Sequence, residues 1–139
     1  MSGVIMKFGG TSVADPDAIG RVAAIVRRQT QAGAGRPPVV VVSALSKVTD
    51  RLIAVARAAE EGNGDAAAAG LKELLDRHLS VASSLTTGAA QAELLAQVRA
   101  EFDDLFGLVR ALAVLREVSP RSLDAVVSVG ELASSRIVT

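Results

Sequence analysis

Four consecutive valines at residues 39–42 constrain the fold more than any other segment of the chain. β-branched side chains at successive positions point to both faces of a strand, so we predict a central strand covered on both sides, as in a parallel sheet. A short apolar run at residues 4–8 stops at a pair of glycines and predicts a second buried strand. Apolar residues at helical spacing follow each run, at 19–26 and 52–59. The first part of the chain therefore predicts a doubly wound α/β arrangement with crossover helices.

The middle of the chain predicts a helical hairpin. One apolar stripe runs over residues 66–82 and a second over 89–115. His78 lies on the first stripe, and we expect a half-buried core residue rather than a catalytic one. A third short strand is predicted at 124–129, and a new helical pattern begins at Gly130. Three strands are few for an α/β sheet, where about five or six are usual, so we expect the N-terminal piece of a longer protein.

The composition excludes several classes of function. Fifteen basic and fifteen acidic residues give a formal net charge of zero, so neither nucleic acid nor an anionic membrane is an expected partner. The chain has no Cys and one His, which excludes disulfides, thiolate catalysis and multi-histidine metal sites, and we predict no metal ligands. No apolar run reaches the ~18 residues of a membrane span, and we expect a cytoplasmic location.

The first candidate site follows the strand at residues 4–8. Adjacent Gly9 and Gly10 let consecutive backbone N–H groups turn inward to form an anion nest. Lys7 can place a positive charge on the same anion, and Thr11 and Ser12 add hydroxyl donors. The helix that follows presents its positive N-terminal end. These features predict a phosphate cradle, while the pattern alone also fits a plain strand-to-helix turn with a solvated Lys7.

Two further polar segments follow predicted strands. Ser43 begins a loop at the carboxyl end of the valine strand, where ligands bind in parallel sheets, and its hydroxyl can donate to phosphoryl or carboxylate oxygens. We interpret Lys47 as solvated and Thr49 as the N-cap of the next helix. Glu131 could bind an ammonium group or a metal, but the pattern alone favours a stabilising charge in the first turn of a helix.

Three segments together resemble aspartokinase, a member of the amino acid kinase superfamily. They are residues 7–13 (KFGGTSV), 42–50 (VSALSKVTD) and 128–132 (SVGEL). The resemblance covers essentially the whole chain. It implies a three-layer α/β/α sandwich with a mostly parallel sheet and a helical hairpin insert at about 66–116. Residues 1–139 would then be the N-terminal portion of the catalytic domain, without its C-terminal half or the regulatory ACT domains.

The resemblance implies transfer of a phosphoryl group from ATP, with Mg²⁺, to the side-chain carboxylate of L-aspartate. The product, 4-phospho-L-aspartate, enters lysine, threonine and methionine biosynthesis. The full-length protein is expected to be a homo-oligomer. This fragment alone is expected to be inactive, because the missing half supplies most of the nucleotide site.

The resemblance also implies roles for individual residues. Lys7 is the expected catalytic residue, in contact with the transferring phosphoryl group. The residues expected to bind the phosphates beside it are Gly9, Gly10, Thr11 and Ser12. Ser43 is expected near both the substrate and the γ-phosphate. Thr49 and Glu131 are expected to bind aspartate, with Glu131 facing its α-ammonium group.

Two alternatives remain open at this point. One is another amino acid kinase, of the glutamate, acetylglutamate or uridylate type. The other is a non-catalytic helical interaction module, which the long apolar stripes of the hairpin suggest.

Overall fold

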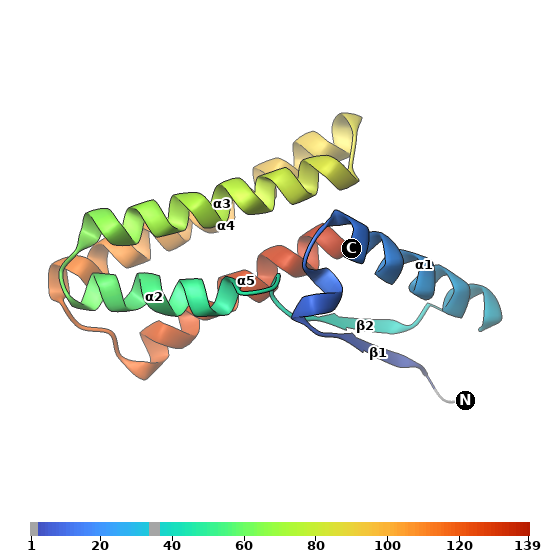
Figure 1. The fold of residues 1–139 in the computed structure, drawn as a ribbon, viewed down its shortest axis with the longest axis horizontal. Coiled ribbons are helices and arrows are strands. Elements are labelled where there is room, and N and C mark those ends of the chain that lie inside the picture. The colour runs from blue at the N-terminus through green and yellow to red at the C-terminus, as the bar shows by residue number, and fades with distance from the viewer. Residues whose placement is uncertain (1–2, 34–36) are drawn as a thin grey trace.

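The computed structural model describes residues 3–33 and 37–139, which form two strands, one 3₁₀ turn and five α-helices (Figure 1). In chain order these are β1 (Ile5–Phe8), η1 (Gly10–Val13), α1 (Pro16–Ala32), β2 (Val39–Val42), α2 (Val48–Glu60), α3 (Gly64–Leu85), α4 (Gly88–Leu115) and α5 (Pro120–Val138). Asp15 begins α1, because its carboxylate accepts a hydrogen bond from the Ala18 N–H at 2.8 Å and Pro16 suits the first helical position.

The two strands pair in parallel, from Ile5 opposite Val39 to Phe8 opposite Val42, as predicted. Helices α1 and α5 lie against the face that carries Phe8 and Val42. The other face is bare within the described residues, with Ile5 73%, Val39 63% and Val41 45% exposed. The expectation that the valine strand is covered on both sides is therefore wrong for this structure. Two parallel strands also do not establish the expected three-layer sandwich.

The predicted third strand at 124–129 is wrong, since these residues lie inside α5. Ser119 caps this helix by accepting a hydrogen bond from the Ser122 N–H at 3.1 Å, and Pro120 takes the first position. The valines of the segment favour a strand by themselves. The buried positions recur every three or four residues, however, and this spacing places them on one helical face. They are Val126, Gly130, Ala133, Ser134 and Ile137.

The core lies between the helices. Helices α3 and α4 form the predicted hairpin, and α2 and α5 pack against it (Figure 1). His78 is fully buried there, not half-buried, with its ring 5.2 Å from that of Phe102 and its Nδ1 2.7 Å from the Leu74 carbonyl oxygen. The expectation of a core histidine is thus confirmed. None of the helices in the described part of the chain combines the length and apolar character that crossing a bilayer demands.

Candidate active site

The first predicted site forms a tight turn directly after β1. Gly9 is extended (φ −78°, ψ 176°), and the Ser12 N–H donates to its carbonyl oxygen at 2.9 Å. Val13 is fully buried and holds the end of the turn in the core. Neither Gly9 nor Gly10 has a positive φ, so the turn does not use the left-handed freedom that we expected of an anion nest. We call residues 9–14 the glycine turn.

Gly10 brings this turn against a second loop. A Cβ on Gly10 would lie 3.4 Å from the Ala44 carbonyl oxygen, 3.7 Å from the Ser46 Cα and 3.9 Å from Ser43 Oγ. The Ser43 N–H also donates to the Phe8 carbonyl oxygen at 3.1 Å, which extends the strand pairing by one step. The loop at 43–47, which we call the serine loop, therefore lies against the glycine turn. This confirms that the polar segments after the two strands meet at one edge of the sheet.

The serine loop ends in a strained residue. Lys47 has φ 64° and ψ 5°, the left-handed region, where a non-glycine residue costs on the order of 1–3 kcal/mol. The buried side chains of Val48 and Leu45 hold the backbone there, and the Val48 N–H donates to the Leu45 carbonyl oxygen at 3.0 Å. Lys47 is the N-cap of α2 and is solvated, as predicted. The prediction that Thr49 is the N-cap is wrong, since Thr49 is the second residue of the helix.

The third predicted segment reaches the same place from α5. A Cβ on Gly130 would lie 2.9 Å from Val48 Cγ1 and 3.2 Å from both the Ala44 Cβ and the Leu52 Cδ1. Only a glycine lets α5 approach α2 and the serine loop this closely. Glu131 follows as an exposed residue in the interior of the helix. Its expected place after a strand, in the first turn of a helix, is therefore wrong.

Ala44 is the point where the three segments meet. Its carbonyl oxygen faces Gly10, and its Cβ faces Gly130. The remaining residues predicted for the site adjoin these contacts along the chain. Exposed ones are Lys7, Thr11, Thr49 and Glu131, and half-buried ones are Gly9, Ser12 and Ser43. The structure thus brings together segments that lie up to 120 residues apart in the sequence, around the single residue Ala44.

Sequence reasoning missed one residue of this site, Arg77 on α3. Its Nη1 donates to the Ser46 carbonyl oxygen at 2.7 Å, and its Nη2 donates to the Ala14 carbonyl oxygen at 3.2 Å. The residue therefore connects the serine loop with the end of the glycine turn. A single arginine beside an apolar helical stripe carries no local signal of such a role, since both acceptors are backbone atoms far away in the sequence.

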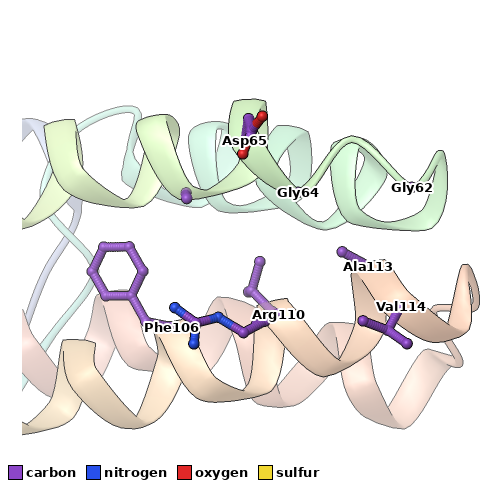
Figure 2. A pocket seen from close by; sticks show the side chains of 9 residues that line it. Gly62, Gly64, Asp65, Phe106, Arg110, Ala113 and Val114 are labelled. Atoms are coloured by element: carbon purple, nitrogen blue, oxygen red, sulfur yellow. The ribbon is translucent and has the colours of Figure 1, made fainter.

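A separate cavity of about 330 Å³ opens between the start of α3 and the second half of α4 (Figure 2). Its lining is mostly apolar, with Asp65 on one helix and Arg110 and Phe106 on the other. None of the residues predicted for the site lines it. Across residues 3–33 and 37–139, no three His, Cys, Asp or Glu side chains gather as a metal site would require. The meeting point at Ala44 is therefore the better candidate for chemistry.

Comparison with known proteins places this chain in a family. The model of the amino acid kinase family matches residues 3–139, so this chain belongs to that family. Among its relatives, a bifunctional aspartokinase/homoserine dehydrogenase 1 of Zea mays is 33% identical over 97% of this chain, and an aspartokinase of Candida albicans is 32% identical over 98%. This chain spans only 14% and 25% of the length of these two proteins.

Solved structures give the same result. Aspartokinase III of E. coli, in complex with aspartate and ADP, matches 99% of this chain at 30% identity with a TM-score of 0.77. The same enzyme in complex with lysine and aspartate matches 98% of this chain at 29% identity with a TM-score of 0.78. In both cases the match spans 28% of the solved chain. The resemblance to aspartokinases is therefore confirmed in sequence and in fold.

Proposed function

We propose that this chain is the N-terminal part of an aspartate kinase catalytic domain. The observation that carries the proposal is the meeting of the three resembling segments around Ala44. It is supported by the match to an aspartokinase that binds aspartate and ADP, which extends over 99% of this chain. The reaction is transfer of the γ-phosphoryl group of ATP to the side-chain carboxylate of L-aspartate.

The reaction suits the chemistry of these residues. The nucleophile is the substrate's own carboxylate, which is ionised at neutral pH and needs no general base. A bond forms between a carboxylate oxygen and the γ-phosphorus, and the bond to the β,γ-bridging oxygen breaks to release ADP. Catalysis then rests on alignment and on neutralising the charge of the phosphoryl group. A chain without Cys, whose single His is buried among the helices, can contribute to such a reaction.

Each predicted site residue has a place in this proposal. Lys7, exposed on β1 next to the glycine turn, neutralises the transferring phosphoryl group. The turn that binds the phosphates comprises Gly9, Gly10, Thr11 and Ser12. Ser43 acts between phosphate and substrate, since its Oγ lies beside Gly10. Thr49 and Glu131 bind aspartate, with the Glu131 carboxylate facing the ammonium group.

Four parts of the proposal rest on the resemblance. Mg²⁺ accompanies ATP, and this cation is commonly held by phosphate oxygens and water, which fits the lack of a ligand cluster in the described residues. The strands β1 and β2 belong to a larger sheet of a three-layer sandwich, which would cover the bare face at Val39 and Val41. The full-length protein is a homo-oligomer and is cytoplasmic.

The test is coupled ADP release with ATP, Mg²⁺ and L-aspartate, on this chain and on its full-length gene product. We expect turnover only in the long form. Glutamate, acetylglutamate and uridylate are tested as alternative phosphoryl acceptors. Preference for one of them would change the assignment from aspartate kinase to the kinase of that acceptor. A folded long form that turns over none of these acceptors would instead favour a non-catalytic helical module.

Lys7 provides a direct test of the site. We expect Lys7→Ala in the full-length protein to reduce turnover by about 100-fold or more, because it removes a charge that acts in the transition state. Stability should change little, since the side chain is exposed. Lys72→Ala is the matched control, because Lys72 is an exposed residue of α3 paired with Asp76. Near-normal turnover of Lys7→Ala would refute the assignment.

A further inference from the structure

Arg77 connects two loops that are distant from it in the sequence. It reaches Ser46, 31 residues away, and Ala14, 63 residues away, with the two terminal nitrogens of one guanidinium group. Both acceptors are backbone carbonyl oxygens, and the side chain is half-buried. Because the guanidinium is planar and its donors have a fixed geometry, the spacing between the two carbonyl groups is set by a rigid group. We call this arrangement the Arg77 bridge.

The bridge adds a contact at the far end of the glycine turn. The direct contacts of the two loops begin at the strand ends, where the Ser43 N–H donates to the Phe8 carbonyl oxygen. They extend to Gly10, which approaches Ala44 and the Cα of Ser46. The bridge contacts Ala14 at the end of the glycine turn and Ser46 near the end of the serine loop. Direct contact at Gly10 and the bridge at Ala14 connect both ends of the glycine turn to the serine loop, and together they determine the distance and the relative orientation of the two loops.

The bridge has a polar surrounding that solvent can reach. A pocket of about 260 Å³ beside it is lined by Lys47, Arg51, Glu73 and Leu74. Arg51 and Glu73 form an exposed ion pair with each other. The Arg77 guanidinium has no carboxylate partner in the described residues, and it donates its hydrogen bonds to the two carbonyl oxygens. The geometry of the loops therefore depends on these two bonds rather than on an ion pair.

We infer that Arg77 is a positioning residue, which holds the glycine turn and the serine loop at the spacing that phosphoryl transfer requires. Its effect on the rate rests on the proposed kinase function, whereas its effect on the loops does not. Misplacement of reacting groups by 1 Å can cost about 100-fold in rate. Loss of the bridge should therefore reduce kcat, and it should change KM less because Arg77 itself does not touch the substrates.

Hydrogen–deuterium exchange tests the effect on the loops in the full-length gene product. We expect Arg77→Met to accelerate amide exchange in both the glycine turn and the serine loop. Arg77→Lys keeps the charge but can reach one carbonyl at a time, so it should accelerate exchange less, and it remains informative if the Met variant does not fold. Arg99→Met removes an exposed arginine of α4 and is the matched control. Unchanged exchange, or faster exchange in only one of the loops, would overturn the inference.

Kinetics of the same variants test the effect on the reaction. We expect Arg77→Met to lower kcat for aspartate-dependent ADP release by about 10- to 100-fold, with partial recovery in Arg77→Lys. A kcat near the wild-type value in Arg77→Met, despite faster exchange, would overturn the positioning role. So would a rise in KM alone, which would indicate direct contact with a ligand. If the wild-type protein shows no turnover with aspartate, the proposed function fails, while exchange still decides whether the bridge holds the loops.

Discussion

Replacing Gly130 by alanine tests the close contact between α5 and the serine loop. The added methyl carbon would lie 2.9 Å from Val48 Cγ1, whereas carbon atoms normally meet at about 3.5–4.0 Å. Overpacking of this kind costs about 1–3 kcal/mol. Alanine also gains about 1 kcal/mol over glycine in the interior of a helix. We therefore expect a net loss of stability of about 0–2 kcal/mol for Gly130→Ala.

Gly107→Ala measures the stability that alanine adds to a helix when its methyl group meets no neighbour. Gly107 is exposed in α4, and a Cβ there would meet nothing within 4 Å. This variant should gain about 1 kcal/mol in stability, so the two variants should differ by about 1–3 kcal/mol. Urea unfolding followed by circular dichroism measures both. Equal stabilisation of Gly130→Ala and Gly107→Ala would refute the contact.

A second control separates stability from activity. A Cβ on Gly70 would lie 2.8 Å from Val55 Cγ2, a contact between α3 and α2 that does not involve Ala44. Gly70→Ala should therefore lose stability as Gly130→Ala does. Only Gly130→Ala should also lower aspartate-dependent ADP release by the full-length protein, because it displaces the serine loop. Equal activities of the two variants would show that the contact between α5 and the serine loop does not affect the proposed reaction.

Three further predictions concern the helices. Burial lowers the pKa of His78 below its ordinary value of about 6.5, so His78 is protonated more readily in the unfolded chain, and stability should fall as the pH drops below about 6.5. Urea unfolding at several pH values should show a smaller fall in stability for His78→Leu than for the wild-type protein. An equal fall in both would contradict the prediction. Asp15→Ala should cost about 1 kcal/mol through loss of the α1 cap, while Thr87→Ala, which removes no capping hydrogen bond, should cost less by the same measurement. Phe102→Ala should cost about 3–5 kcal/mol, because it empties a buried site next to His78, and thermal unfolding that shows a loss below about 1 kcal/mol would contradict this packing.

The sequence alone determined the elements that have local signals. The valine run and the apolar run before Gly9 predicted both strands, and parallel pairing followed from the helix between them. Asp15 and Pro16 predicted the start of α1, and the apolar stripes predicted the hairpin and the buried His78. These features depend on the spacing of side chains and on caps within a few residues, which a single chain displays without knowledge of its partners.

The candidate site could be predicted only in part. The pattern located the glycine turn and the serine loop, because polar segments after parallel strands meet at one edge of the sheet. The resemblance drew attention to Gly130 and Glu131, but the assignment of the residues before them to a strand was wrong. β-branched residues such as Val126 fit either state, and packing against α2 and α4 decides for the helix.

Only the tertiary structure decided which atoms meet. The contact of Ala44 with Gly130 depends on how closely α5 approaches the loop after β2, and its contact with Gly10 depends on the pairing of β1 with β2; no local spacing encodes either. The Arg77 bridge depends on two backbone carbonyl groups, and every residue has such a group, so no residue type marks the acceptors. Local sequence determines which helices and strands can form, whereas contacts between distant segments arise from the packing of all of them together.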